Sequence, residues 1–122
     1  MSEVAAMVYA VLCVGIIGFQ LCLIAGAPWG PLTQGGRHPG ALPASGRIAA
    51  ALSIVLLSLM AGAVLSAAGL WLSWPAWAGW TVLGIQALSA LLNWITPSPA
   101  ERRLWGPVTT VMLGLVALVL LG

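Results

Sequence analysis

Four apolar stretches, each about twenty residues long, constrain the fold of this chain more than any other feature. A hydrocarbon core of about 30 Å is crossed by about 20 residues of α-helix, which rises about 1.5 Å per residue. No stretch alternates polar and apolar residues as the strands of a membrane barrel do. We therefore predict an all-α, four-transmembrane-helix bundle that forms a single transmembrane domain over residues 1–122. The predicted spans are residues 4–26, 47–69, 76–95 and 99–121.

The composition agrees with this class. Hydrophobic residues make up 61% of the chain and charged residues 5%, whereas a soluble domain carries about 25% charged residues. A net charge of +2 is too small for nucleic-acid binding, which needs many basic residues to displace phosphate counterions. The first stretch differs from a signal peptide, because no basic residue precedes it and Glu3 has the opposite charge. We expect the lipid bilayer as the main partner and no nucleic acid.

The arginines predict the orientation. All four lie in or beside the first and third connections, which share one side of the bundle: Arg37, Arg47, Arg102 and Arg103. Basic residues concentrate on the cytoplasmic side of membrane proteins. We therefore expect loops 27–46 and 96–103 in the cytoplasm and both termini outside it.

Tryptophans test the span boundaries independently, because the indole ring prefers the membrane interface. None of the seven falls in the middle of a predicted span. They are Trp29, Trp71, Trp74, Trp77, Trp80, Trp94 and Trp105.

One span carries a polar face. Gln86, Ser89 and Asn93 recur at steps of three and four residues, which places them on one side of a helix. Amides facing lipid would leave their donors unsatisfied, so this face should point into the bundle, with Gln20 as its partner. Two interpretations stay open: hydrogen bonding between helices, and a polar binding site between helices 1 and 3.

Small residues predict where the first two spans meet. Gly18, Cys22 and Gly26 recur every four residues in the first, and Ser58, Gly62 and Ser66 do so in the second. Small residues permit close approach of helices in lipid, so we expect these two rows to face each other.

The connections hold the other distinctive residues. Residues 27–46 form a long, Gly- and Pro-rich loop between helices 1 and 2, and we interpret it as an ordered lid over the bundle. In the third connection, Ser98 and Glu101 have the spacing of a capping box, with Pro99 at the first helical position. Pro107 is expected to kink the fourth helix.

These two connections resemble a small family of four-helix membrane proteins from high-GC Gram-positive bacteria, which has no assigned activity. The first motif runs APWG, then GG with His38 and Gly40, then LP. The second includes Asn93, Thr96, Ser98, Glu101-Arg102, Trp105 and Pro107-Val108, with Thr96 where the family pattern would have Ser. The resemblance implies a location in a bacterial inner membrane, and that the loops, rather than the spans, hold the distinctive residues.

Three functions remain open, and we expect no cofactor, metal site or catalytic residue. The first, which the low polarity of the spans favours over the two alternatives, is a structural or accessory protein that binds another membrane protein or a second copy of itself. The second is a binding or transport protein for a small molecule or lipid, with its site under the 27–46 loop. The third, an enzyme acting on lipid headgroups, lacks an evident nucleophile. The candidate binding residues are Gln20, Trp29, Gln34, Arg37, His38, Gln86, Asn93, Glu101 and Arg102.

Overall fold

The computed structural model describes residues 1–70 and 72–122, and over these residues the chain is helical and contains no strand. Four helices there are long and apolar enough to cross a membrane. The prediction of an all-α chain with four such helices is therefore confirmed, whereas Trp71 lies outside the described residues. The long helices are α1 (Ser2–Ile24), α2 (Ala44–Ala67), α3 (Ala76–Ile95) and α4 (Pro99–Leu121), and two short 3-10 helices, η1 (Gly30–Leu32) and η2 (Gln34–Gly36), lie between α1 and α2.

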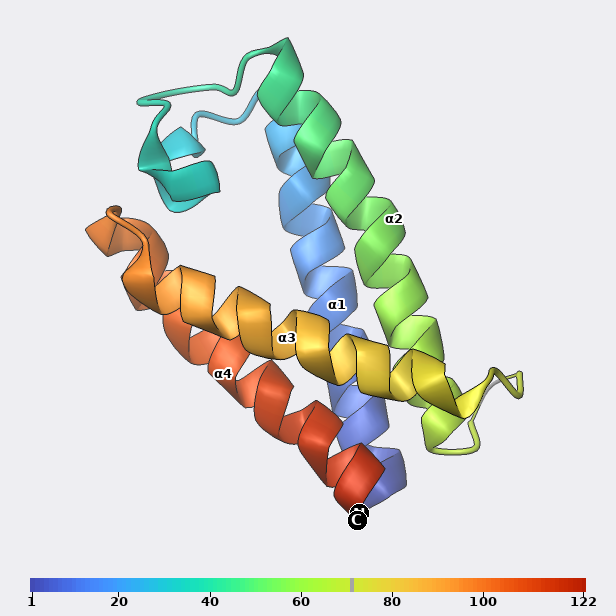
Figure 1. The fold of residues 1–122 in the computed structure, drawn as a ribbon. Coiled ribbons are helices and arrows are strands. Elements are labelled where there is room, and N and C mark those ends of the chain that lie inside the picture. Colours follow the sequence, from blue (N-terminus) through green and yellow to red (C-terminus); the bar gives the residue numbers. More distant parts are fainter. Residues whose placement is uncertain (71) are drawn as a thin grey trace.

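The four helices form two hairpins that diverge from one end of the molecule to the other (Figure 1). α1 packs along α2, and α3 packs along α4, while contacts between the hairpins are made chiefly by α1 with α4. The hairpins converge where the two termini meet, with Ser2 beside Gly122. We call this the narrow end. At the opposite, wide end, η1 and η2 lie between the start of α2 and the start of α4 (Figure 1).

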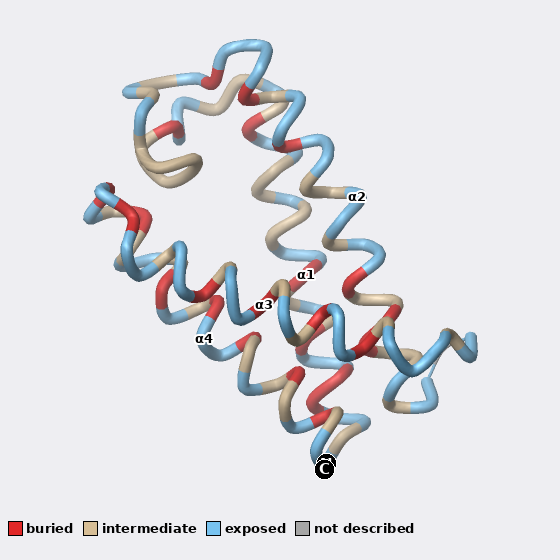
Figure 2. Tube along the Cα trace, viewed as in Figure 1, coloured by how far each residue is buried: buried red, intermediate tan, exposed pale blue. Residues whose placement is uncertain are grey.

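The main core lies toward the narrow end, on the inner faces of the four helices (Figure 2). Tyr9, Cys13 and Val116 are fully buried there, and Met112 nearly so. A second, smaller core at the wide end joins Leu23, Leu42 and Ala50. The outward faces of the helices carry large apolar side chains such as Val11 and Leu52, as lipid-facing helices do.

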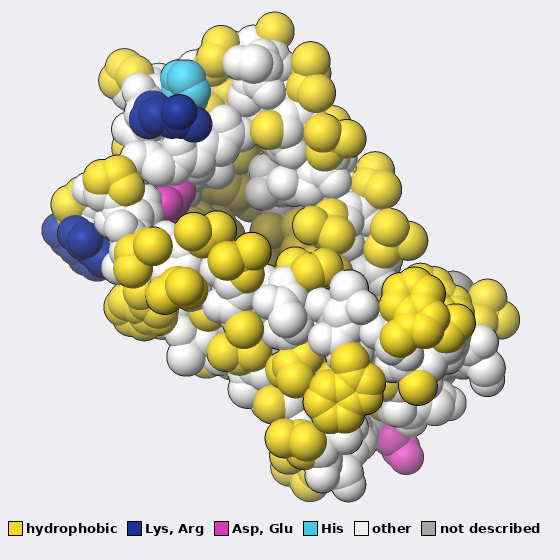
Figure 3. Space-filling model, viewed as in Figure 1, with side chains coloured by type: hydrophobic (Ala, Val, Ile, Leu, Met, Phe, Trp, Pro, Cys, Tyr) yellow, Lys and Arg dark blue, Asp and Glu magenta, His cyan; other side chains and the backbone are white. Residues whose placement is uncertain are grey.

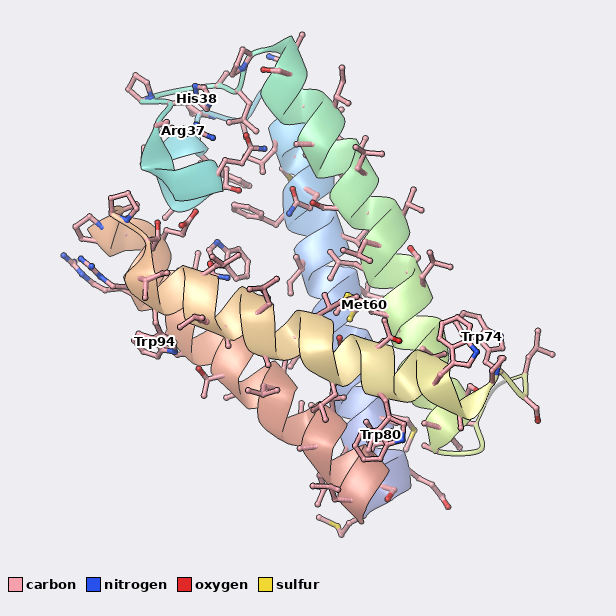
Figure 4. All side chains as sticks on the ribbon, in the orientation of Figure 1. Arg37, His38, Met60, Trp74, Trp80 and Trp94 are labelled. Atoms are coloured by element: carbon pink, nitrogen blue, oxygen red, sulfur yellow. The ribbon has the colours of Figure 1, made fainter. Side chains whose placement is uncertain are left out.

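The predicted contact between small-residue rows is wrong. An added Cβ at Gly62 would lie 2.6 Å from Cη2 of the Trp74 indole ring. The backbone N–H of Trp74 donates to Ser66 Oγ over 2.8 Å. The groove on α2 is therefore filled by an indole ring (Figure 4 labels Trp74). On α1, an added Cβ at Gly18 would meet nothing within 4 Å.

The long loop expected between helices 1 and 2 is not confirmed. The helices are closely spaced, and η1 and η2 occupy the centre of this connection. The Gly30 N–H donates to the Gly40 carbonyl over 2.9 Å, which closes the connection on itself. Gly35 and Gly36 have φ of 77° and 69°, a region that glycine enters without steric cost. These residues let the chain reverse direction within η2. The cytoplasmic position of this segment stays a prediction.

The start of α4 confirms half of the predicted capping box. Ser98 is the N-cap residue, and its Oγ accepts a hydrogen bond from the Glu101 N–H over 3.2 Å. The other half is wrong, because the Ser98 N–H donates to Thr96 Oγ1 and the Glu101 carboxylate accepts from the Gly35 N–H over 3.1 Å. The carboxylate thus joins α4 to η2. Pro107 lies inside α4, and the kink expected there stays a prediction.

Candidate functional site

A cavity of about 270 Å³ lies between the hairpins toward the wide end. We call it the inner cavity. Figure 3 shows the molecule hollowed below the η1–η2 segment (residues 30–36), with acidic atoms at the rim of the hollow. The polar part of the lining comes from α1, α2, η2, α3 and α4, so the cavity belongs to the whole bundle. These lining residues include Gln20, Gln34, Gln86, Ser89, Asn93 and Glu101.

The floor of the inner cavity is a buried hydrogen-bond network between three helices. The Tyr9 hydroxyl on α1 donates to Gln86 Oε1 on α3 over 2.9 Å. The Gln86 amide in turn donates to the Thr109 carbonyl on α4 over 3.4 Å. Such bonds between membrane helices contribute about 0.6–2 kcal/mol each. The partner predicted for Gln86 was therefore wrong: it is Tyr9 and Thr109, while Gln20 lines the cavity above them.

The η1–η2 segment forms the roof and is bound to the first turns of α4. Ser98 Oγ donates to the Pro31 carbonyl over 2.7 Å, and Trp105 Nε1 donates to the Leu32 carbonyl over 2.8 Å. Gly36 packs so closely on Ser98 that an added Cβ would lie 2.6 Å from Ser98 Cβ. Together with the Gly35–Glu101 bond, these contacts hold the roof over the cavity.

Gln34 occupies a strained position in this roof. Its φ of 51° lies in the left-handed region, which non-glycine residues enter rarely. The side-chain amide donates to the Gly46 carbonyl at the start of α2 over 2.8 Å. Strained residues of this kind persist where surrounding contacts hold them, and they concentrate at ligand sites.

Three aromatic rings join the roof to the wall. Phe19 on α1 stacks on Trp29, with ring centroids 5.6 Å apart, and meets Trp105 of α4 edge to face at 5.0 Å. Phe19 and Trp105 line the inner cavity. The cavity therefore combines aromatic rings, amides and one carboxylate within a largely apolar shell.

A second, more open space of about 440 Å³ lies outside the first. We call it the outer groove. It is formed by η2 and the end of α3, and it shares Gln34, Asn93 and Glu101 with the inner cavity. Its remaining wall includes Leu92 and Ile95, which are 52% and 64% exposed. The three shared side chains thus stand between the inner cavity and the outer surface of the bundle.

The structure brings five of the nine predicted site residues into the inner cavity: Gln20, Gln34, Gln86, Asn93 and Glu101. The other four are described residues that lie outside both linings. Trp29 stacks on Phe19, while Arg37 is exposed and donates to the Gln34 carbonyl. The Arg102 guanidinium donates to the Thr96 carbonyl over 3.2 Å. His38 is half-buried, and its backbone carbonyl lies close to Gly30 within the connection (Figure 4 labels His38).

Sequence reasoning missed Tyr9, Phe19 and Trp105. Tyr9 carried a usable signal, since it is the one tyrosine of the chain and lies within an apolar span, where a buried hydroxyl needs a partner. Trp105 belongs to the second motif but was not taken as a site residue, and Phe19 carried no signal, because an aromatic residue near a span end is equally typical of the membrane interface.

Within the described residues, no three side chains of His, Cys, Asp and Glu gather closely enough to hold a metal ion. No family model, curated protein or solved structure matches this chain.

Proposed function

We propose that this chain is a multi-pass membrane protein that binds a small molecule in the inner cavity, with the polar head of that molecule among the amides. The observation that carries this proposal is the grouping of Gln20, Asn93 and Glu101 around one space. Polar side chains are rare between membrane helices and often line binding sites. A cavity lined by several of them, with an aromatic wall, has the make-up of a ligand site.

The size and chemistry of the cavity favour binding over catalysis. Its volume of about 270 Å³ lies just below the range of ligand sites, which span about 300–1,000 Å³. Two of its hydroxyl groups are engaged with their own helices, as Ser53 donates to the Ala49 carbonyl and Thr109 to the Trp105 carbonyl. A nucleophile needs an adjacent base instead. An enzyme acting on lipid headgroups is therefore not what this arrangement favours.

We further propose that the wide end faces the cytoplasm of a bacterial cell. Support comes from the arginines, which all lie on the connections or helix starts at this end: Arg37, Arg47, Arg102 and Arg103. The termini would then lie outside the cytoplasm. The expectation of a partner-binding accessory protein stays a prediction, because lipid alone accounts for apolar side chains on the outer helix faces.

The test compares two serines of the same helix. Ser53 lines the inner cavity, whereas Ser58 is exposed on the outside of α2. Ser53→Leu would fill the cavity, and Ser58→Leu would add an apolar side chain facing lipid. The proteins are purified in nanodiscs, and small molecules that co-purify are measured by mass spectrometry.

We expect a molecule that co-purifies with the unaltered protein and with Ser58→Leu, and that is depleted from Ser53→Leu. The proposal fails if the unaltered protein retains none, or if both variants retain it equally.

A further inference from the structure

Glu101 is a buried carboxylate whose hydrogen-bond partner is a neutral backbone group. It is 6% exposed, and its side chain lines both the inner cavity and the outer groove. The Gly35 N–H donates to it over 3.1 Å. A buried charge is costly unless an opposite charge accompanies it. The first turn of α4 offsets part of this cost, because the positive end of the helix dipole lies there.

Three of the four arginines at the wide end donate hydrogen bonds to backbone carbonyls. Arg37 Nε donates to the Gln34 carbonyl, and Arg102 donates to the Thr96 carbonyl. Arg47 donates to the Leu42 carbonyl over 2.9 Å and to the Ile24 carbonyl, so it closes the end of α1. These three arginines thus bond to backbone oxygens, Arg103 is exposed, and the carboxylate remains available to a cation in the cavity.

The walls of the cavity select the kind of cation. One carboxylate does not make a site for a metal ion, which needs several anionic or imidazole ligands. The faces of Phe and Trp rings attract organic cations, and Phe19 and Trp105 both line the cavity. These groups together suit an ammonium group.

The outer groove indicates how such a group would arrive. It shares Gln34, Asn93 and Glu101 with the inner cavity as a common wall, and its apolar wall of Leu92 and Ile95 is exposed at the end of α3. In a bilayer this wall would contact lipid chains near the interface.

We propose that the inner cavity binds the ammonium group of an amphiphile, which reaches Glu101 from the bilayer through the outer groove. This inference rests on the proposed function, since it names the ligand of that site. The head of the molecule lies against Glu101, Phe19 and Trp105, and its chain lies along Leu92 and Ile95. The carboxylate supplies the charge, and the groove supplies the preference for a molecule with an apolar tail.

The test uses the full chain in nanodiscs and three probes: dodecyltrimethylammonium, dodecanol and tetramethylammonium. Binding is measured by calorimetry below micelle-forming concentrations and compared with empty nanodiscs. We expect dodecyltrimethylammonium to bind about tenfold or more tightly than dodecanol, which has the same tail without the charge. Tetramethylammonium, which has the head alone, should bind more weakly than the tailed cation.

Two variants locate the charge. Glu101→Gln removes the carboxylate and keeps an oxygen for the Gly35 N–H, so it should abolish the preference for dodecyltrimethylammonium over dodecanol. Glu3→Gln is the matched control, because Glu3 is exposed at the narrow end, and it should change nothing. Circular dichroism establishes that both variants are folded, and the comparison of probes on the unaltered protein does not depend on either.

The outcomes separate this inference from the proposed function. If dodecanol binds as tightly as the cation, and Ser53→Leu abolishes both, then the cavity binds ligands and the ammonium preference is wrong. Tetramethylammonium binding as tightly as dodecyltrimethylammonium would overturn access from the bilayer and indicate a soluble cation. If Ser53→Leu leaves every probe bound as before, the proposed function itself fails.

Discussion

At the narrow end Tyr9, Cys13 and Val116 are fully buried among the four helices, whereas at the wide end Gln20, Gln34 and Asn93 line a cavity. The same four apolar helices build both ends. The difference lies in what separates the hairpins: at the wide end the η1–η2 segment bonds to α4 and keeps the space roofed. Helices in lipid associate through packing and interhelical bonds rather than a hydrophobic drive, so a roof of this kind allows them to diverge without collapse.

The largest expected effect is a loss of stability from overpacking toward the narrow end. Gly62 toward the narrow end has the Trp74 ring 2.6 Å from an added Cβ, so Gly62→Leu should destabilise the fold by about 3 kcal/mol. Ser53→Leu, on the same helix at the inner cavity, should leave stability nearly unchanged. Thermal unfolding in detergent, followed by circular dichroism, compares the two. Equal losses would mean that the wide end is as tightly packed as the narrow end.

A smaller effect is expected in the roof. Gly36 combines a φ of 69° with close packing on Ser98, so Gly36→Ala should cost about 2 kcal/mol of local stability. Gly40→Ala is its control, because an added Cβ there meets nothing within 4 Å. Hydrogen exchange should quicken at residues 30–36 in Gly36→Ala and leave the narrow end unchanged. Exchange that quickens equally along α1 and α4 would show that the roof does not act locally.

The smallest effect concerns the floor that divides the two ends. Tyr9→Phe removes the donor to Gln86 Oε1 and should lower the free energy of unfolding by about 1 kcal/mol. A double-mutant cycle with Gln86→Leu isolates the pair, and we expect a coupling of about 0.6–1.7 kcal/mol. A coupling of zero would remove this bond from the account.

The sequence sufficed for the helices and for half of the site, for physical reasons. Four apolar stretches with unbroken backbone bonding leave little alternative to four helices. The inward face of Gln86, Ser89 and Asn93 followed from helical periodicity and the cost of amides in lipid, and all three line the inner cavity.

Partner choice between distant segments did not follow from local pattern. The Glu101 carboxylate bonds to Gly35, 66 residues away in the chain, because the positive-φ turn of η2 brings that N–H to it. The capping-box spacing gives no sign that the Gly35 N–H takes the place of the Ser98 N–H as the donor to this carboxylate. Likewise, the small residues Gly62 and Ser66 are as compatible with a neighbouring helix as with the Trp74 indole that fills their groove.

The most direct test of the contrast between the two ends is thiol labelling. Cys13 is fully buried in the core, and Cys22 is exposed, so Cys22→Ala leaves Cys13 as an internal reference. Ser89→Cys places a second thiol in the lining of the inner cavity. Intact mass after treatment with a cationic, water-soluble methanethiosulfonate reports both.

We predict that the thiol introduced by Ser89→Cys is labelled, that Cys13 is not, and that dodecyltrimethylammonium slows the labelling. A thiol at position 89 that is as unreactive as Cys13 would contradict the account, because the wide end would then be closed to polar molecules.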